Sequence, residues 1–73
     1  MPLCDVAAGK TVRVVSVDAG HGLKSRLAAM GVLPNVALHV MRNEGAGQII
    51  VSIKNSKVVL GRGASHKIFV TAE

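Results

Sequence analysis

The side chains that could hold a metal ion are one cysteine, three histidines and a few carboxylates. They are Cys4, His21, His39 and His66, together with Asp5, Asp18 and Glu44. Chelating pairs usually lie a few residues apart in the chain, and no two of the histidines or the cysteine do. Isolated histidines are more often surface residues than ligands. We therefore expect no resident metal or cofactor and treat Cys4, His21, His39 and His66 as weak metal candidates.

Groups that could carry out catalysis are also sparse. No serine, histidine and aspartate surround a recognisable nucleophile turn. The stretch GAGQ (45–48) lacks the Lys-Ser/Thr pair that follows in a phosphate-binding loop. The chain has only four acidic residues, which leaves few choices for a pair of catalytic carboxylates. The sequence therefore predicts a protein that is not an enzyme.

Basic residues exceed acidic ones by nine to four, which gives a net charge of +5. An excess of positive charge favours an acidic partner. The basic residues are dispersed along the chain, so charge alone does not define a site. From the positions of these basic residues along the chain, we expect a docking surface on the outer face of one predicted helix and on nearby loops. One apolar residue is included in this surface. The predicted partner-binding residues are Lys24, Arg26, Leu33, Arg42, Lys54, Lys57 and Arg62.

Aromatic residues are nearly absent, since Phe69 is the single Phe and there is no Trp or Tyr. Binding of single-stranded nucleic acid without sequence preference relies on aromatic platforms for the bases. Capture of proline-rich peptides relies on an aromatic-lined groove. Neither surface can be built from one phenylalanine, which we expect in the core.

One short helix is predicted in an otherwise β-rich chain. Leu23, Leu27 and Met30 are spaced as one stripe of a helix of about 8–10 residues. Gly31 is suited to end this helix, and Pro34 prevents its continuation. Because so short a helix is marginal in water, its apolar stripe must dock on other elements. We expect it to plug an open end of the β structure.

Runs rich in β-branched residues predict five strands. The first, TVRVVSV (11–17), has apolar residues on both faces, with Val12 and Val14 on one face and Val17 on the other. It is therefore expected to be central in the sheet. The others are expected at 35–41, 49–53, 58–60 and 67–71, with turns at 42–48 and 54–57 and a glycine-broken corner with a single 3₁₀ turn at 61–66. Five short strands close most simply into a barrel without free edges. The predicted fold is mostly β: a single domain over 1–73, a small SH3-like five-stranded barrel with one short helix between its first two strands.

The cellular setting follows from what the chain lacks. Cys4 is the single cysteine, so no internal disulfide can form, and a lone thiol suits the reducing cytosol. The opening MPLCDVAAG has neither the basic nor the apolar region of a secretion signal. No apolar run approaches the ~18 residues of a spanning helix. We expect a cytoplasmic protein.

Taken in order, these segments resemble the FeoA family (ferrous iron transport protein A). The resemblance runs from Leu3 to about Val70 and is carried by GK-VRVV (9–15), G-L-SRLAAMGVLPN (22–35), V-L-V (36–40), IIVSI (49–53) and VVLGRGASHKIFV (58–70). Asn35 stands where the family usually has glycine, and asparagine is a common substitute at positive φ. The arginine pair of the family's helix is partly kept, as Lys24 and Arg26, and Ala64 matches the alanine before the closing strand.

The resemblance implies an SH3-like barrel that is a cytoplasmic accessory component of bacterial ferrous iron uptake. Such proteins are thought to act on the cytosolic, GTPase-bearing part of the membrane transporter FeoB, to which this chain would be recruited at the inner membrane. The same fold also forms a C-terminal module of metal-dependent repressors. An RNA- or ribosome-binding barrel of the KOW type is the alternative, because AGKTVRVVSVDAGHG (8–22) also resembles the start of that module. Against it, a helix follows where the KOW module has a second strand. Weak self-association remains open.

Overall fold

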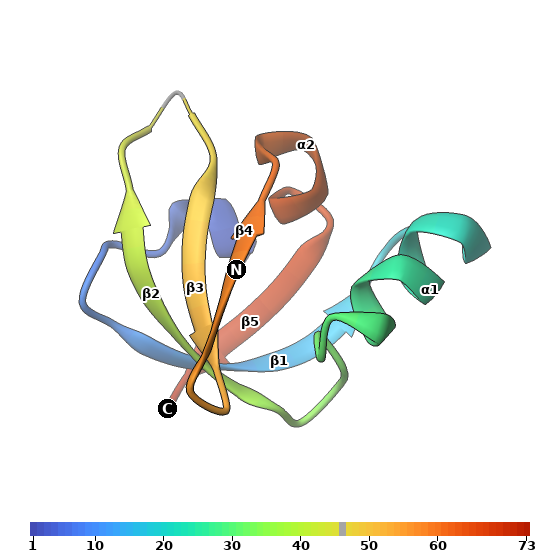
Figure 1. The fold of residues 1–73 in the computed structure, drawn as a ribbon, viewed down its shortest axis with the longest axis horizontal. Helices are drawn as coiled ribbons and strands as arrows, with labels where there is room; N and C mark the ends of the chain where they lie inside the picture. Colours follow the sequence, from blue (N-terminus) through green and yellow to red (C-terminus); the bar gives the residue numbers. More distant parts are fainter. Residues whose placement is uncertain (46) are drawn as a thin grey trace.

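The structure is a computed structural model that describes residues 1–45 and 47–73. A 3₁₀ turn, η1 (Leu3–Asp5), precedes five strands and two helices. In chain order these are β1 (Thr11–Val17), α1 (His21–Ala29), β2 (Ala37–Asn43), β3 (Ile49–Ile53), β4 (Ser56–Leu60), α2 (Arg62–Ser65) and β5 (Ile68–Ala72). The mostly β fold with a short helix between the first two strands is therefore confirmed (Figure 1). No helix in the described part of the chain is long and apolar enough to cross a membrane.

The five strands form one antiparallel sheet in the order β4-β3-β2-β1-β5. The predicted central position of β1 is confirmed, since it pairs with both β2 and β5. The expected complete closure is wrong, because within residues 1–45 and 47–73 no ladder joins β4 to β5. α2 spans the gap between these two strands along the chain (Figure 1). The sheet therefore keeps two edge strands.

The core is formed by aliphatic residues that alternate along the strands. It contains Leu3, Val6, Val12, Val14, Val17, Leu27, Val32, Leu38, Val40, Ile49, Val51, Ile53, Leu60, Ile68 and Val70. A register shift between Val14 and Ser16 adds one residue to β1, which turns Val17 to the same side as Val14, contrary to the prediction from strict alternation. Phe69 was expected in the core but is only half-buried, because its neighbours Ile68 and Val70 take the inward positions of β5.

Helix α1 has the predicted length and ends as its sequence indicates. Gly31 adopts φ +93°, its N–H donates to the carbonyl of Ala28 at 3.0 Å, and the N–H of Val32 donates to the carbonyl of Leu27 at 2.9 Å. These two bonds and the buried Leu27–Val32 pair form a Schellman motif. Two residues beyond Leu33, Asn35 takes φ 72°, so the positive φ expected there is confirmed.

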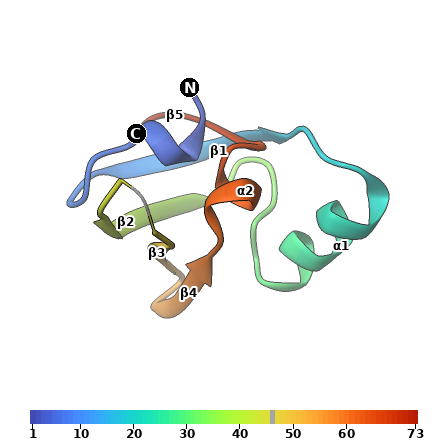
Figure 2. The ribbon, with the colours of Figure 1, turned by 90° about the horizontal axis from the view of Figure 1, so that it is seen from above.

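The apolar stripe of α1 is buried only in part. Leu27 is fully buried, Leu23 is partly buried against the core, and Met30 is 41% exposed. The helix lies at one end of the molecule, away from η1 and the chain termini near β5 (Figure 2). The helix therefore docks on the core through Leu27 and Leu23, as expected, whereas the third residue of the predicted stripe, Met30, stays largely outside the core.

The turns lie where the sequence predicts them, and the bounds of the adjoining strands differ from the prediction by a few residues. Lys54 and Asn55 have φ of 50° and 68°, as a two-residue type I′ hairpin requires, so β4 begins at Ser56. β2 continues to Asn43, two residues past the expected end, and Ala46 of the β2–β3 connection lies outside the described residues. The expected 3₁₀ corner is the four-residue α-helix α2.

Candidate functional site

A groove separates α1 from β4 and α2. Its volume is about 420 Å³. α1 contributes one wall and the end of β4 with the start of α2 the other. The lining residues are Leu23, Arg26, Leu27, Ala29, Met30, Val59, Leu60, Gly61 and Ala64. We call this space the α1–β4 groove.

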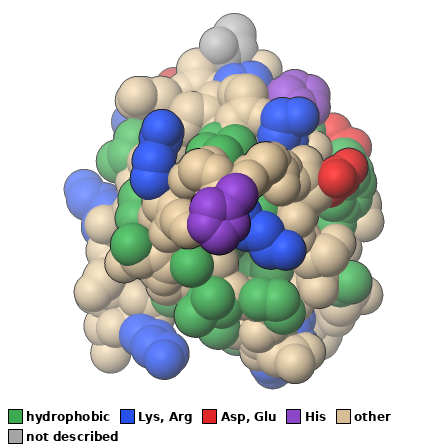
Figure 3. Space-filling model, turned by 90° about the vertical axis from the view of Figure 1, so that its right-hand side faces the viewer, with side chains coloured by type: hydrophobic (Ala, Val, Ile, Leu, Met, Phe, Trp, Pro, Cys, Tyr) green, Lys and Arg blue, Asp and Glu red, His purple; other side chains and the backbone are tan. Residues whose placement is uncertain are grey.

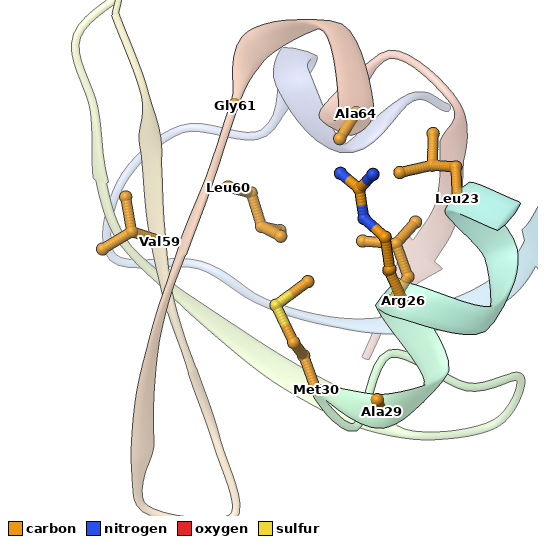
Figure 4. A pocket seen from close by; sticks show the side chains of 9 residues that line it. Leu23, Arg26, Ala29, Met30, Val59, Leu60, Gly61 and Ala64 are labelled. Atoms are coloured by element: carbon orange, nitrogen blue, oxygen red, sulfur yellow. The ribbon is translucent and has the colours of Figure 1, made fainter.

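The two walls of the α1–β4 groove differ in character. On the helix side, the side chains of Leu23, Arg26 and Met30 project toward the space (Figure 4). On the strand side, Leu60 points into it, whereas the side chain of Val59 points away (Figure 4). Val59 nevertheless lines the groove, so its main chain forms part of the wall. The groove thus combines an apolar helix face with exposed strand backbone.

The rim of the α1–β4 groove is basic. Arg26 reaches into the space from α1, and Lys24 lies exposed on the same helix. In the described parts of the chain the salt bridges are Arg13–Glu73 at 2.7 Å and Arg42–Glu44 at 3.6 Å, so neither Lys24 nor Arg26 is paired. None of the described residues that line the groove is acidic. The face that carries α1 shows hydrophobic side chains near its centre with Lys and Arg side chains around them (Figure 3).

The other predicted partner-binding residues lie elsewhere. Leu33 is 44% exposed, just beyond α1. Arg42 and Lys57 share a hollow of about 250 Å³ with Met41 and Ile50. Lys54 is exposed in the β3–β4 turn. The structure therefore places Arg26 at the groove, leaves Lys24 exposed on the same helix, and brings Arg42 and Lys57 together at a second place.

Arg62 is directed inward and forms several internal hydrogen bonds. Its Nε donates to the carbonyl of Gly47 at 3.0 Å, and its Nη2 donates to Oδ1 of Asn43 at 2.9 Å. Asn43 in turn donates through Nδ2 to the carbonyls of Cys4 at 2.9 Å and Val6 at 2.7 Å. These bonds tie the first residues of the chain to β2 and α2. We call the pair Asn43–Arg62 the polar tie; nothing in the local sequence around either residue pointed to it.

The structure also brings two of the weak metal candidates together. Sγ of Cys4 lies 3.2 Å from Nδ1 of His66, and 3.8 Å from Oδ1 of Asp5. Nδ1 of His39 contacts Oγ1 of Thr11 at 2.9 Å, and His21 is exposed at the start of α1. Among residues 1–45 and 47–73 no three His, Cys, Asp or Glu side chains are grouped so as to hold a metal ion. Burial, with the neighbouring carboxylate of Asp5, raises the pKa of the Cys4 thiol and so disfavours the thiolate that binds metals.

The raised pKa of Cys4 can be measured by alkylation. The rate of reaction with iodoacetamide should rise with pH around a midpoint above the ordinary thiol pKa of 9.0, because burial and Asp5 both disfavour the thiolate. Asp5→Asn should lower that midpoint. Since the folded state binds the proton more tightly than the unfolded chain, this group stabilises the fold below the unfolded pKa and loses its contribution as pH rises through the folded one. A midpoint below that of the urea-unfolded chain would contradict the assignment.

Comparison with known proteins agrees with this architecture. The FeoA domain model matches residues 1–72. Putative Fe(2+) transport protein A of Methanocaldococcus jannaschii is 41% identical over 69 residues, which is 94% of this chain and 83% of that protein. The crystal structure of an iron uptake regulatory protein (FeoA) superposes with a TM-score of 0.95 at 26% identity, over 100% of this chain and 97% of that one.

A larger protein contains the same fold. A manganese-dependent transcriptional repressor has a TM-score of 0.90 at 29% identity, and the match covers 100% of this chain but 41% of the repressor. The family model spans nearly the whole chain, and the sequence order of strands and helix is that of the matched structures. The chain therefore belongs to the FeoA family.

Proposed function

We propose that this protein is a non-enzymatic, cytoplasmic accessory protein of ferrous iron uptake that docks on the cytosolic, GTPase-bearing part of a FeoB-type transporter. Membership of the FeoA family and the name of the relative from M. jannaschii support the link to Fe(2+) transport. The observation that carries the docking role is the α1–β4 groove, which pairs an apolar lining with an unpaired basic rim.

The size of the protein suits an adaptor. Its accessible surface is 4249 Å². A standard interface takes ~800 Å² from each partner, about a fifth of this surface. Apolar groups in the groove would supply most of the affinity, whereas Lys24 and Arg26 would speed and orient the encounter with an acidic face. Leu33, exposed just beyond the end of α1, is a further apolar contact in this proposal.

The RNA-binding alternative has less support. A basic track along a phosphate backbone needs clustered, available side chains. Arg13 is paired with Glu73, Arg42 with Glu44, and Arg62 belongs to the polar tie. In addition, α1 directly follows β1, where a KOW-type barrel has a second strand. These features favour a protein partner over a nucleic acid.

Reversal of the two helix charges tests the docking surface. Lys24→Glu with Arg26→Glu should weaken binding to the purified cytosolic domain of the transporter by at least about tenfold, mainly through slower association. Both side chains are exposed, so thermal unfolding should be unchanged. Association and dissociation rates from surface plasmon resonance provide the measurement.

A matched control separates this site from a general charge effect. Lys10→Glu with Lys67→Glu changes the net charge equally, at two exposed lysines that do not line the α1–β4 groove and are not among the predicted partner-binding residues. This variant should bind nearly as the unmodified protein does. Equal weakening by both double variants would show that binding follows net charge, and would remove α1 from the interface.

A further inference from the structure

The two edge strands of the sheet, β5 and β4, differ in whether another segment of the chain pairs with their outer side. The outer side of β5 is covered by the start of the chain: Pro2 forms a bridge with Phe69, the N–H of Val70 donates to the carbonyl of Met1 at 2.8 Å, and the Met1 ammonium donates to the carbonyl of Val70 at 2.9 Å. The outer side of β4 has no such cover, since no described segment pairs with it there. Folded proteins usually protect such edges, so an open one beside a groove calls for an explanation.

The register of the β3–β4 hairpin identifies the free main-chain groups. The pairs are Ile53–Ser56, Ser52–Lys57, Val51–Val58, Ile50–Val59 and Ile49–Leu60. In a hairpin with a two-residue turn the pair next to the turn exchanges both hydrogen bonds, and bonded pairs then alternate. The N–H and C=O groups of Lys57 and Val59 therefore point away from β3, toward the open edge. Among the described residues, neither has a main-chain partner outside the hairpin.

The open edge and the α1–β4 groove are continuous. Val59 lines the groove through its main chain, and Leu60 directs its side chain into it (Figure 4). A strand laid along β4 would alternate its own side chains between the groove and the outer face of the sheet. Those on the groove side would approach Leu60, Leu23 and Met30, and those on the outer face would lie beside Lys57.

We propose that β4 accepts an extended segment of the transporter's cytosolic domain as a sixth strand of the sheet. This proposal rests on the proposed function and specifies how the same surface binds. Main-chain bonds to Lys57 and Val59 hold the segment, and apolar side chains at alternate positions enter the groove. The segment carries Asp or Glu on its other face, opposite Lys57, because opposite charges across a strand pair are favourable. Arg26 at the rim favours the same acidic chemistry.

A second copy of this chain is a poorer occupant of the edge. Each copy carries a net charge of +5. Pairing β4 with β4 would bring two Lys57 side chains onto the same face of a continuous sheet, and like charges placed there are unfavourable. Charge complementarity therefore selects an acidic partner strand.

Amide hydrogen exchange of the isotopically labelled protein, with and without the cytosolic domain, tests the proposal. In the free protein the amides of Lys57 and Val59 should exchange quickly, whereas those of Val58 and Leu60, which face β3, should be protected. On complex formation Lys57 and Val59 should become at least about tenfold slower. A complex in which these two amides still exchange quickly would overturn strand addition but leave the proposed function standing; absence of any complex would overturn both.

Two variants at one position isolate the main-chain donor. Val59→Ala shortens the side chain and keeps the N–H, whereas Val59→Pro removes the N–H on the side that faces the open edge, where proline is tolerated in edge strands. Val59→Pro should bind at least about tenfold more weakly than Val59→Ala, since one hydrogen bond is lost and its partner is left unpaired. Equal affinities would contradict the proposal. Protection of Lys57 and Val59 that grows with protein concentration in the absence of the domain would show that a second copy occupies the edge, which also contradicts it.

Discussion

Leu27→Ala should destabilise the protein by about 2–5 kcal/mol, the range for removing a fully buried leucine from a packed core. Leu27 is the one α1 residue with no exposed surface, and it packs beside Val32 at the end of the helix. An isolated helix of this length is marginal in water, so its stability depends on this contact. Loss of Leu27 therefore removes both core packing and the anchor that holds one wall of the α1–β4 groove.

Urea unfolding followed by circular dichroism would measure this effect. The Leu27→Ala variant should also bind the transporter's cytosolic domain more weakly, because α1 is no longer fixed. Met30→Ala provides the stability control: Met30 is the C-cap residue of the same helix but is 41% exposed, so truncating its side chain should cost less than about 1 kcal/mol. A loss below ~1 kcal/mol for Leu27→Ala would show that α1 does not depend on Leu27.

Asn43→Ala should destabilise the protein by about 2–3 kcal/mol, because three hydrogen bonds to residues distant in sequence are lost, together with a longer local one from the N–H of Gly45 at 3.4 Å. Its Nδ2 donates to the carbonyls of Cys4 and Val6, and its Oδ1 accepts from Arg62. All three bonds join parts of the chain that are distant in sequence. Without Asn43, the first residues of the chain lose their connection to β2, and Arg62 loses an acceptor.

A change that keeps the shape of Asn43 separates its two roles. Asn43→Asp retains the acceptor for Arg62 but replaces the donor with an oxygen that faces two carbonyls, so it should also be destabilising. Gln48→Ala removes an exposed amide from the same connection and should change stability by less than about 0.5 kcal/mol. Thermal and urea unfolding of the three variants provide the measurement. An Asn43→Asp variant as stable as the unmodified chain would show that the donor bonds contribute nothing.

Features encoded by neighbouring residues were predictable from the sequence. The β-branched runs of β1 and β3 lie at the predicted positions because extended backbone suits those side chains. The end of α1 followed from Gly31, and the turn at Asn35 from the tolerance of asparagine for positive φ. The five β-branched runs and the single helix between the first two predicted the fold class, and the family resemblance agreed with it.

Features that depend on distant contacts were not predictable in this way. The bulge in β1 reverses the side on which Val17 lies, and its origin is the pairing with β5 at the other end of the chain. Strand count alone suggested a closed barrel, yet closure depends on whether β4 and β5 meet, which their sequences do not specify. Met30 follows the helical period of the core but faces the groove instead.

In the candidate site, too, the features encoded by neighbouring residues were predictable and those that depend on distant contacts were not. Lys24 and Arg26 were identified because charges on one short helix share its surface. The polar tie was missed, since Asn43 and Arg62 are 19 positions apart and neither stands in a recognisable motif. The contact between Cys4 and His66 spans 62 positions. The free main-chain groups of β4 carry no side-chain signature at all, and only the sheet order reveals them.

Because β1 and β5 are neighbours in the sheet, the order in which the chain is synthesised limits when it can fold. The bond between Met1 and Val70 joins residues 69 positions apart. The entropy of closing a loop over such a separation is lost before the stabilising contacts form. Folding is therefore slower in proteins with many contacts between residues distant in sequence. Chains grow at about 5–20 residues per second, so β1 is made some seconds before β5. During translation the sheet therefore stays incomplete until β5 has been synthesised.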